Sequence, residues 1–296
     1  MTFFLLAGGS GTRVEPLSRS KPKPLFPLNG DALLRLLLSQ LARLGLREGF
    51  INLRHLGEQI RAAVPKRPRI TFIEERRLSG CRVVKKALNS GAGLILVLNG
   101  DVFLEIPLAV MREKMATTAA DGVLLVRNDL SGAYRPLRVE ADDFFGMASE
   151  TPAPGVIFSG VALLNRRTVA AIHNPNIIRA LALEGGRLRI KVVRDDGIWL
   201  DIGDPWSYLR ANFAYRHYLG QGAGNACSPG VYISRRAAVS RSVIWENTRI
   251  LGRSRISECL VAGGLRLQDF SAERAIVTGE GVFPLPFSAA AVGQGT

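Results

Sequence analysis

The apolar residues of the first 220 positions follow two alternating spacings. Uninterrupted apolar runs predict buried strands, and they fall at Thr2–Ala7, Phe50–Leu53, Ile70–Ile73, Leu94–Leu98 and Gly122–Val126. Between them, apolar residues recurring every three or four positions predict helices at Asp31–Leu44, Leu56–Val64, Val83–Leu88 and Leu108–Ala119. Asp31 is of a residue type that caps helix N-termini. The alternation predicts an α/β fold: a Rossmann-like, mostly parallel sheet covered by helices.

In sheets of this kind, ligands bind beyond the carboxyl ends of the strands. The loops that follow Ala7 and Leu98 are therefore the first places to look for chemistry.

The pattern changes after a glycine-rich linker at Gly220–Gly224. A six-residue period follows, carried by Tyr232, Ala238, Ile244, Ile250, Ile256 and Ala262. Such a period is typical of a short parallel β-helix with inward aliphatic side chains, and an antiparallel β-meander is the alternative. We therefore predict a domain at 1–220, a linker at 221–228, a β-helix at 229–282 and a tail at 283–296 that caps the helix or frays.

Composition narrows the class of protein. The chain has 296 residues, of which 47% are hydrophobic, so a disordered chain is excluded. No apolar run approaches the roughly 18 residues that span a bilayer, and the apolar N-terminus is too short for a signal peptide. Three widely spaced cysteines (Cys81, Cys227, Cys259) favour neither disulfides nor a zinc site. We expect a reducing, cytoplasmic compartment and no membrane partner.

The net charge of +14 raises the possibility of a nucleic-acid partner. However, the basic residues are mostly arginines spread along the chain, and the densest stretch, Arg61–Lys86, is interrupted by Glu74 and Glu75. Aromatic residues make up only 7% of the chain, and no recognised nucleic-acid module is present. A solvated basic surface is the better interpretation, and phosphorylated small molecules suit the same charge.

The strongest local motif follows the first predicted strand and reads Leu6-Ala7-Gly8-Gly9-Ser10-Gly11-Thr12-Arg13. Glycines let backbone N–H groups approach phosphate oxygens without obstruction by a Cβ atom. The motif is neither a dinucleotide fingerprint nor a Walker A loop. Lys23 follows ten residues after Arg13, between two prolines. A guanidinium and an ammonium converging on a polyphosphate would stabilise the charge of a leaving pyrophosphate.

This motif, continued by Pro16-Leu17 and Pro22-Lys23-Pro24-Leu25, resembles the signature of sugar-1-phosphate nucleotidyltransferases. Further segments are similar to the same family: Asn52-x-x-His55-Leu56-x-Glu58, Leu96–Asp101, Phe158–Val161 and Trp199–Asn212. The added hexapeptide region is similar to the mannose-1-phosphate guanylyltransferase-like branch, where it is a left-handed β-helix. The resemblance implies in-line attack of a sugar 1-phosphate on the α-phosphate of an NTP, with GTP favoured and pyrophosphate released.

The resemblance also implies roles for individual residues. Arg13 and Lys23 are the expected catalytic cations, and Asp101 and Asp201 are the expected ligands of Mg²⁺. Gly160 and Glu150 are expected at the sugar phosphate. The expected nucleotide-binding residues are Leu6, Ala7, Gly8, Gly9, Ser10, Gly11, Thr12, Glu74 and Gly80. Exposed faces of the β-helix leave a homo-oligomer open.

Four positions depart from the family pattern. Ser79 and Arg82 replace glycines in the segment that holds the base, and Thr151 stands where many relatives have a lysine at the sugar phosphate. Asp204 stands where threonine is usual. These departures leave a second hypothesis open, a regulatory or binding paralogue with impaired catalysis. They also leave the base and the sugar unassigned, with thymidylyl or uridylyl transfer to glucose 1-phosphate as an alternative specificity.

Overall fold

The computed structural model describes residues 1–65, 69–75, 80–184 and 187–286, and its contacts divide them into two compact units. Within the described residues, the first unit contains Met1–Gly9 and Leu37–Trp199, and the second contains Ser10–Leu36 and Leu200–Pro286. The predicted boundaries follow the order of the sequence, whereas the units do not. Residues 10–36 leave the large sheet and pack with the C-terminal part of the chain, so the glycine-rich loop is divided between the two units.

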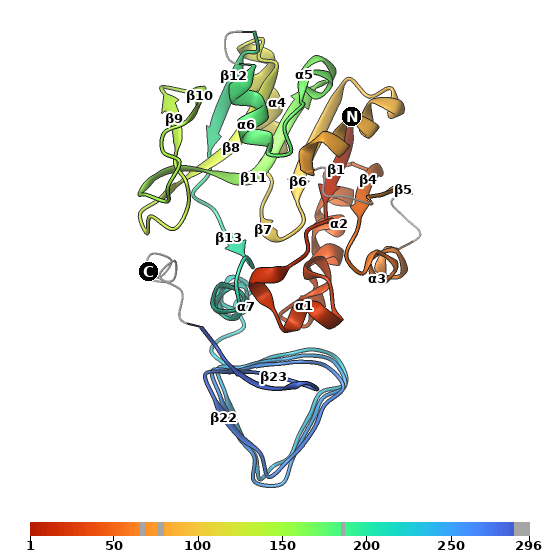
Figure 1. Cartoon of the computed structure of the whole chain (residues 1–296), viewed down its shortest axis with the longest axis vertical. Coiled ribbons are helices and arrows are strands. Elements are labelled where there is room, and N and C mark those ends of the chain that lie inside the picture. The colour runs from red at the N-terminus through yellow and green to blue at the C-terminus, as the bar shows by residue number, and fades with distance from the viewer. Residues whose placement is uncertain (66–68, 76–79, 185–186, 287–296) are drawn as a thin grey trace. The chain divides into compact units, whose positions relative to one another are not determined.

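The first unit is built on one sheet with the strand order β5-β4-β1-β6-β11-β8-β12-β10-β9 (Figure 1). Within the described residues, β11 and β10 run opposite to the other strands of this sheet, which are parallel to one another. The predicted mostly parallel sheet is therefore confirmed. The strands span Thr2–Leu6 (β1), Glu48–Leu53 (β4), Arg69–Glu74 (β5), Leu94–Asn99 (β6), Gly122–Asp129 (β8), Leu137–Glu140 (β9), Asp143–Met147 (β10), Gly155–Asn165 (β11) and Ile190–Arg194 (β12).

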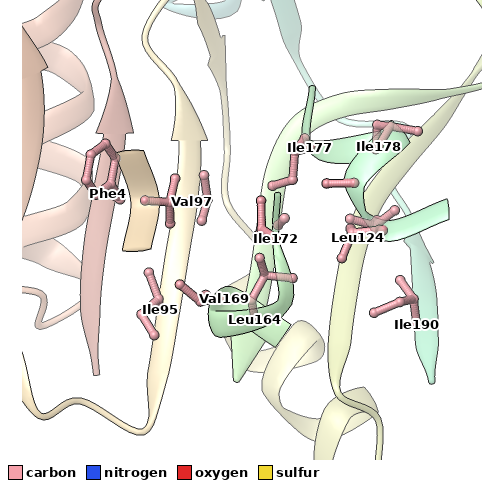
Figure 2. Packing of buried hydrophobic residues seen from close by; sticks show 14 of the residues in the cluster. Phe4, Ile95, Val97, Leu124, Leu164, Val169, Ile172, Ile177, Ile178 and Ile190 are labelled. Carbon is pink, nitrogen blue, oxygen red and sulfur yellow. The ribbon is translucent and has the colours of Figure 1, made fainter. Parts of the chain in front are cut away.

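Helices cover this sheet and close its core. They are α3 (Gly57–Ala63), the 3₁₀ helix η3 (Gly80–Ser90), α4 (Leu108–Thr117), α5 (Arg166–Ala171) and α6 (Ile177–Leu183), and the short β7 is Val102–Leu104. Figure 2 shows one cluster of the core, where Phe4, Val97 and Leu164 of the strands meet Val169 and Ile172 of the α5 region. Burial of aliphatic side chains of this size contributes about 1.5–3 kcal/mol each.

The predicted strands of this unit are confirmed to within a few residues at their ends. The predicted helix at Val83–Leu88 lies inside η3, which has the tighter 3₁₀ geometry. The prediction that Asp31 caps a helix is wrong, because Asp31 lies in the short strand β3 (Asp31–Ala32) and α2 (Leu33–Arg43) begins two residues later. Its carboxylate lies instead 3.9 Å from Arg35.

The N-terminal part of the second unit consists of short elements. They are η1 (Thr12–Val14), α1 (Leu17–Ser20), η2 (Lys23–Leu25), and the hairpin of β2 (Pro27–Leu28) with β3. Tyr208 and Asn212 of α7 (Pro205–Tyr218) bind this hairpin, since Tyr208 Oη donates to Pro27 O at 2.7 Å and Asn29 N–H donates to Asn212 Oδ1 at 2.7 Å. The strand β13 (Trp199–Asp201) precedes α7.

The C-terminal part is the predicted short left-handed parallel β-helix, whose stacked coils form the triangle of Figure 1. Its strands are β14 (Ala226–Cys227), β15 (Tyr232–Ile233), β16 (Ala238–Ser240), β17 (Val243–Ile244), β18 (Arg249–Leu251), β19 (Arg255–Ser257), β20 (Leu260–Val261), β21 (Arg266–Gln268), β22 (Ser271–Glu273), β23 (Ala275–Thr278) and β24 (Gly281–Pro284). β14 begins inside the predicted linker. β24 runs antiparallel to β23, so the chain turns back on its last coil. Residues 287–296 of the predicted tail lie outside the described residues.

The strict six-residue period is wrong for the first coil. Tyr232 pairs with Arg249, and Arg249 with Arg266, so one coil takes 17 residues, one fewer than three hexapeptides. The inward positions consequently shift by one residue between coils. Ile244, Ile250 and Ile256 are buried as predicted, whereas Tyr232 is 51% exposed. Ala238 is exposed too.

Among the described residues, no helix is both long and apolar enough to cross a membrane.

Candidate active site

The first half of the glycine-rich loop is held by a buried polar network of the first unit. The Ala7 N–H donates to Asn52 Oδ1 at 2.6 Å, and Asn52 Nδ2 donates to Glu75 Oε2 at 3.0 Å. Asn52 is 2% exposed and Glu75 9%. On the other side of β1, Gly100 N–H donates to Leu6 O at 2.9 Å. The loop therefore leaves the sheet along a path fixed by β4, β5 and the turn after β6.

Gly8 has to be glycine for a steric reason. A Cβ atom at Gly8 would lie 2.6 Å from Asn52 Nδ2 and 2.9 Å from Glu75 Oε2. Gly9 differs, because nothing lies within 4 Å of a Cβ placed there. Gly9 and Ser10 are both exposed residues.

The second half of the loop belongs to the second unit and requires glycine for a backbone reason. Gly11 has φ +70°, in the left-handed region. Its carbonyl accepts hydrogen bonds from Ser18 Oγ at 2.8 Å and from Val14 N–H at 3.0 Å. Thr12 and Arg13 then begin η1 with exposed side chains. Within the described residues, Arg13 has no carboxylate partner at ion-pair distance, so its guanidinium is available to an anion.

Lys23 is held differently from Arg13. Its side chain is buried, and Nζ donates to the backbone carbonyl of Gly203 at 3.0 Å. The prolines on either side restrict the backbone, and η2 closes with a hydrogen bond from Phe26 N–H to Lys23 O at 2.9 Å. A charged ammonium group that is shielded from water is stabilised strongly when an anion binds beside it.

The two expected metal ligands follow strands of different units. Asp101 lies two residues after the end of β6, and Asp201 is the last residue of β13, each partly exposed. A Cβ at Gly203 would lie 2.9 Å from Asp201 Oδ2, so glycine leaves that carboxylate room. Carboxylate oxygens are the donors that a hard divalent cation such as Mg²⁺ prefers, so the residue types fit the expected ion. Among the described residues, no three His, Cys, Asp or Glu side chains gather into a metal site.

Asp204 caps the N-terminus of α7, which explains its residue type. Its carboxylate accepts hydrogen bonds from Ser207 N–H at 2.9 Å and Ser207 Oγ at 2.7 Å. Aspartate and threonine both serve as N-caps, so this departure from the family pattern leaves the helix start intact.

Gly160 lies at an irregularity of β11. The register between β11 and β8 shifts between Phe158 and Ala162, and Gly160 has φ +99°. A Cβ there would lie 3.3 Å from Asn99 at the end of β6. Next to it, the Ser159 hydroxyl is buried without a hydrogen-bond partner among the described residues. The bulge therefore brings an open polar group to the carboxyl end of β6.

Trp199 packs beside this bulge. Its Nε1–H donates to Ser159 O at 2.9 Å, and its ring makes an edge contact with Tyr134 at 5.4 Å between centroids. The Arg127 guanidinium lies over the same ring at 5.2 Å. Burial lowers the pKa of Arg127, although Asp195 and Asp196 oppose this. Its guanidinium also donates a long hydrogen bond, of 3.4 Å, to Gly197 O.

Three further predicted residues, Glu150, Glu74 and Gly80, have no observed hydrogen bond or ion pair with the glycine-rich loop or Lys23 in the described residues. Glu150 is exposed and forms an ion pair with Arg179 of α6. Glu74 ends β5, is exposed and pairs with Arg61. Gly80 begins η3, and Ser79 lies outside the described residues. Arg82 is exposed.

Asn52 and Glu75 were missed as site residues by sequence reasoning. Asn52 was part of the motif around His55, but nothing in its spacing connected it to Ala7. Glu75 was overlooked in favour of its neighbour Glu74. Their polar types at the ends of two apolar strands were the only available signal.

Comparisons with known proteins show which proteins this chain resembles. Residues 3–132 match the sequence model of the family described as Nucleotidyl transferase. The matched stretch includes the whole glycine-rich loop, Lys23 and Asp101, whereas Gly160 and Asp201 lie beyond it.

Curated proteins that are similar to this chain carry related names. The chain is 26% identical, over 70% of its length and 61% of the relative's, to a Sulfolobus acidocaldarius protein named "Putative mannose-1-phosphate guanyltransferase". It is 25% identical to the UTP–glucose-1-phosphate uridylyltransferase of Synechocystis, covering 91% of this chain and 76% of that protein. It is 24% identical to the bifunctional sugar-1-phosphate nucleotidylyltransferase/acetyltransferase of Sulfurisphaera tokodaii, covering 72% and 55%. The chain spans 53–61% of the length of the first curated relatives.

Solved structures share the fold. A UDP-glucose pyrophosphorylase from Acinetobacter baumannii superposes with a TM-score of 0.63 at 17% identity, covering 72% of this chain and 92% of that one. HddC from Yersinia pseudotuberculosis, complexed with GMP-PN, gives a TM-score of 0.60 at 22% identity, covering 72% and 99%.

Proposed function

We propose that this protein is a sugar-1-phosphate nucleotidyltransferase, which joins an NTP and a sugar 1-phosphate to give an NDP-sugar and pyrophosphate. The observation that carries the proposal is the glycine-rich loop after β1, in which Gly9 and Ser10 are exposed, followed by Arg13 and the buried Lys23. The match of this segment to the nucleotidyl transferase family supports it. Leu6, Ala7 and Gly8 shape the loop, while Gly11 and Thr12 turn it toward Arg13.

The phosphate of the sugar is itself the nucleophile, so the protein needs no nucleophilic side chain. Catalysis then rests on positioning and on neutralising charge at the α-phosphate and the leaving pyrophosphate. Arg13 offers a guanidinium without a carboxylate partner in the described residues, and Lys23 offers an ammonium that burial has separated from water. Together they would stabilise the leaving group.

We also propose that Asp101 and Asp201 hold Mg²⁺. When bound, the ion would supply positive charge against the negative charge of the reacting phosphates. Asp101 and Asp201 would hold it through carboxylate oxygens, the donors that Mg²⁺ prefers. Calorimetry with a non-transferable nucleotide tests this without turnover: Asp101→Asn should remove the gain in nucleotide affinity that Mg²⁺ gives the wild type.

For the sugar 1-phosphate, we propose the bulge of β11. The open Ser159 hydroxyl and the backbone at Gly160 suit a polyol, and Arg127 suits its phosphate. Glu150 stays a candidate from sequence alone. Its ion pair with Arg179 is exposed, and exposed pairs are weak enough to be exchanged for a ligand.

We propose GTP and mannose 1-phosphate as the substrates. The name of the Sulfolobus relative and the GMP-PN bound to HddC favour this pair. The uridylyl-transferring relatives favour UTP and glucose 1-phosphate as the alternative.

We further propose a cytoplasmic location, on the cysteine content alone, and no nucleic-acid partner. A homo-oligomer formed through the β-helix is a separate proposal.

The decisive experiment is a matrix of NTPs against sugar 1-phosphates with pyrophosphate release as the readout. Release confined to GTP with mannose 1-phosphate would support the full proposal, and release with another pair would reassign the substrates only. Absence of release with every pair, together with nucleotide binding in calorimetry, would replace the proposal by the binding paralogue. Absence of both would overturn the nucleotide site.

A further inference from the structure

The segment around Lys23 is bound to the β-helix on both sides of the lysine. All of these contacts lie within the second unit. Before the lysine, Lys21 Nζ pairs with Glu246, and its ammonium lies 5.1 Å from the centre of the Trp245 ring. After it, the Phe26 ring lies 4.9 Å from Trp245 and 5.2 Å from Tyr208, centroid to centroid. One corner of the β-helix therefore supports the chain on each side of Lys23.

The centre of this support is Trp245, which directly follows β17. Trp245 is 1% exposed, and both Tyr208 and Phe26 are fully buried. Trp245 therefore connects the β-helix to the buried core that α7 forms with the residues after η2.

Two buried hydrogen bonds give this cluster a fixed geometry. Trp245 Nε1–H donates to Tyr208 Oη at 2.9 Å, and Tyr208 Oη–H donates to Pro27 O at 2.7 Å. Burial raises the pKa of Tyr208, so the phenol stays a donor at neutral pH. Because proline has no N–H, the carbonyl of Pro27 is the backbone group available here for bonding, and the phenol occupies it. Each such bond is costly to leave unmade in a buried site.

The same tyrosine reaches Lys23 by a second route. Tyr208 belongs to α7, and its N–H donates to Asp204 O at 2.9 Å. Asp204 is next to Gly203, whose carbonyl accepts from Lys23 Nζ at 3.0 Å. On the other side, Phe26 N–H binds Lys23 O, and Pro27 binds the phenol. Lys23 thus lies in a closed ring of contacts that passes through Tyr208.

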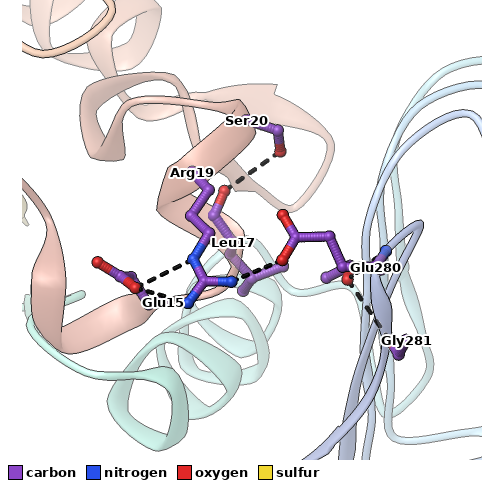
Figure 3. Close-up of polar contacts among 7 residues, drawn as sticks. Glu15, Leu17, Arg19, Ser20, Glu280 and Gly281 are labelled. Carbon is purple, nitrogen blue, oxygen red and sulfur yellow. Dashed lines mark hydrogen bonds and ion pairs between the residues drawn. The ribbon is translucent and has the colours of Figure 1, made fainter.

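A second connection lies farther along the β-helix. Figure 3 shows the guanidinium of Arg19 between two carboxylates, with Glu280 at 2.6 Å and Glu15 at 3.0 Å. These side chains are about half exposed, so the pair contributes little by itself. It joins α1 to the turn after β23, and so adds a second contact between the N-terminal part of the second unit and the β-helix.

We propose that the β-helix is a brace for the signature segment, and that Trp245 and Tyr208 are positioning residues that keep the Lys23 ammonium at its place. The brace is a property of the fold, and its effect on turnover rests on the proposed function. The β-helix then serves the reaction from outside the substrate site, by restricting where one cation can lie.

The test compares Trp245→Phe and Tyr208→Phe with the wild type and with Tyr232→Phe. Tyr232→Phe is the matched control, because Tyr232 lies on the same β-helix with its side chain half exposed. Lys23 is labelled with an amine-reactive reagent, its modification is followed by mass spectrometry, and thermal melting confirms folding. We expect Tyr208→Phe to raise the labelling rate of Lys23 about tenfold, since it leaves two buried polar groups without partners. Trp245→Phe should raise it less, and Tyr232→Phe should leave it unchanged.

Unchanged labelling in folded variants would overturn the brace. If both aromatic variants fail to fold, Glu246→Gln supplies the test, because Glu246 is accessible and its loss frees only Lys21. Labelling of Lys23 equal to the wild type in that variant would overturn the brace as well. A second measurement follows turnover. In Tyr208→Phe, kcat should fall while KM for the nucleotide changes less than threefold. Labelling needs no turnover, so an inactive wild type would count against the proposed function and leave the brace test intact.

Discussion

Gly8 and Gly11 lie three residues apart in one loop, yet different parts of the protein hold them. Gly8 faces the buried amide of Asn52 and the carboxylate of Glu75, which belong to the large sheet. Gly11 faces Ser18, in a segment that packs with α7 and the β-helix. Gly8 is required because of close approach, and Gly11 because of its positive φ. One sequence motif thus contains two unrelated structural requirements.

The supports of the two halves also differ in chemistry. In the first unit, side-chain hydrogen bonds from strand ends fix the loop. In the second, an aromatic cluster fixes the chain on either side of Lys23. A polar network is geometrically exact but fails when one member is lost, whereas an aromatic cluster tolerates change as long as its volume is kept. The two halves should therefore respond differently to mutation.

The largest effect should come from replacing a charged residue that we propose acts on the phosphates or the metal ion. We expect Lys23→Ala, in the second unit, and Asp101→Asn, in the first, each to lower kcat by about 10²–10³, as loss of transition-state stabilisation does. Lys86→Ala is the control, because Lys86 is exposed on η3. Pyrophosphate release measures turnover, and circular dichroism checks the fold. Turnover near that of the wild type in either variant would argue against its assigned role.

The next effect should come from Gly11→Ala. An L-residue at φ +70° is strained, and the added Cβ would lie 2.9 Å from Ser18 Cβ. We expect a loss of about 2–4 kcal/mol in the free energy of unfolding, measured by urea denaturation. Gly9→Ala, where nothing lies within 4 Å of the new atom, should cost less than about 1 kcal/mol. Equal losses in the two variants would contradict the backbone requirement at Gly11.

Gly8→Ala tests the polar network of the first unit that holds the other half of the loop. Its Cβ would displace the Asn52 amide or the Glu75 carboxylate, both buried, and we expect a loss of about 1–3 kcal/mol in unfolding free energy. Gly9→Ala again serves as the control. If the network positions the loop, Gly8→Ala should also weaken nucleotide binding in calorimetry more than Gly9→Ala does. Identical affinities would confine the network to a role in stability.

The smallest effect tests a site outside both supports. The hydrogen bond from Lys114 lowers the pKa of Asp142. A carboxylate with a lowered folded-state pKa contributes stability above its unfolded value, about 3.9, and loses it as pH falls toward the folded value. The Asp142 side chain is 47% exposed, so Asp142→Asn should cost no more than about 0.5 kcal/mol at pH 7. In urea titrations, the difference from wild type should shrink as pH falls below about 4. A difference that stays constant as pH falls through this range would have another cause.

Much of the fold could be predicted, because strands and helices leave their period in the sequence. Thr2–Ala7 and Leu94–Leu98 read as buried strands from their composition alone. The β-helix is visible in the six-residue recurrence, but its coil lengths of 17 and, in the last coil, 16 residues are not, since the missing residues are hidden among polar loop positions. Tyr232 was consequently predicted to face inward and lies outside.

The candidate site was predictable to the extent that it is a motif. Glycines, Arg13 and Lys23 lie within eighteen residues of one another, so their pattern can be read directly. Asn52 and Glu75 could not be found in this way, because their connection to Ala7 exists only across neighbouring strands. Trp245 is more than two hundred residues away from Lys23, and no local pattern connects them.

By itself, the sequence determined the order of strands and helices, the glycine-rich loop with its cations, and the change to a β-helix. These are local properties, set by side-chain periodicity and by the conformational freedom of glycine. The tertiary structure alone decided that residues 10–36 pack with the C-terminal part of the chain, and that Tyr208 and Trp245 lie beside the Lys23 segment. Such pairings depend on which buried surfaces complement one another across long stretches of chain, and no short window of sequence contains both surfaces.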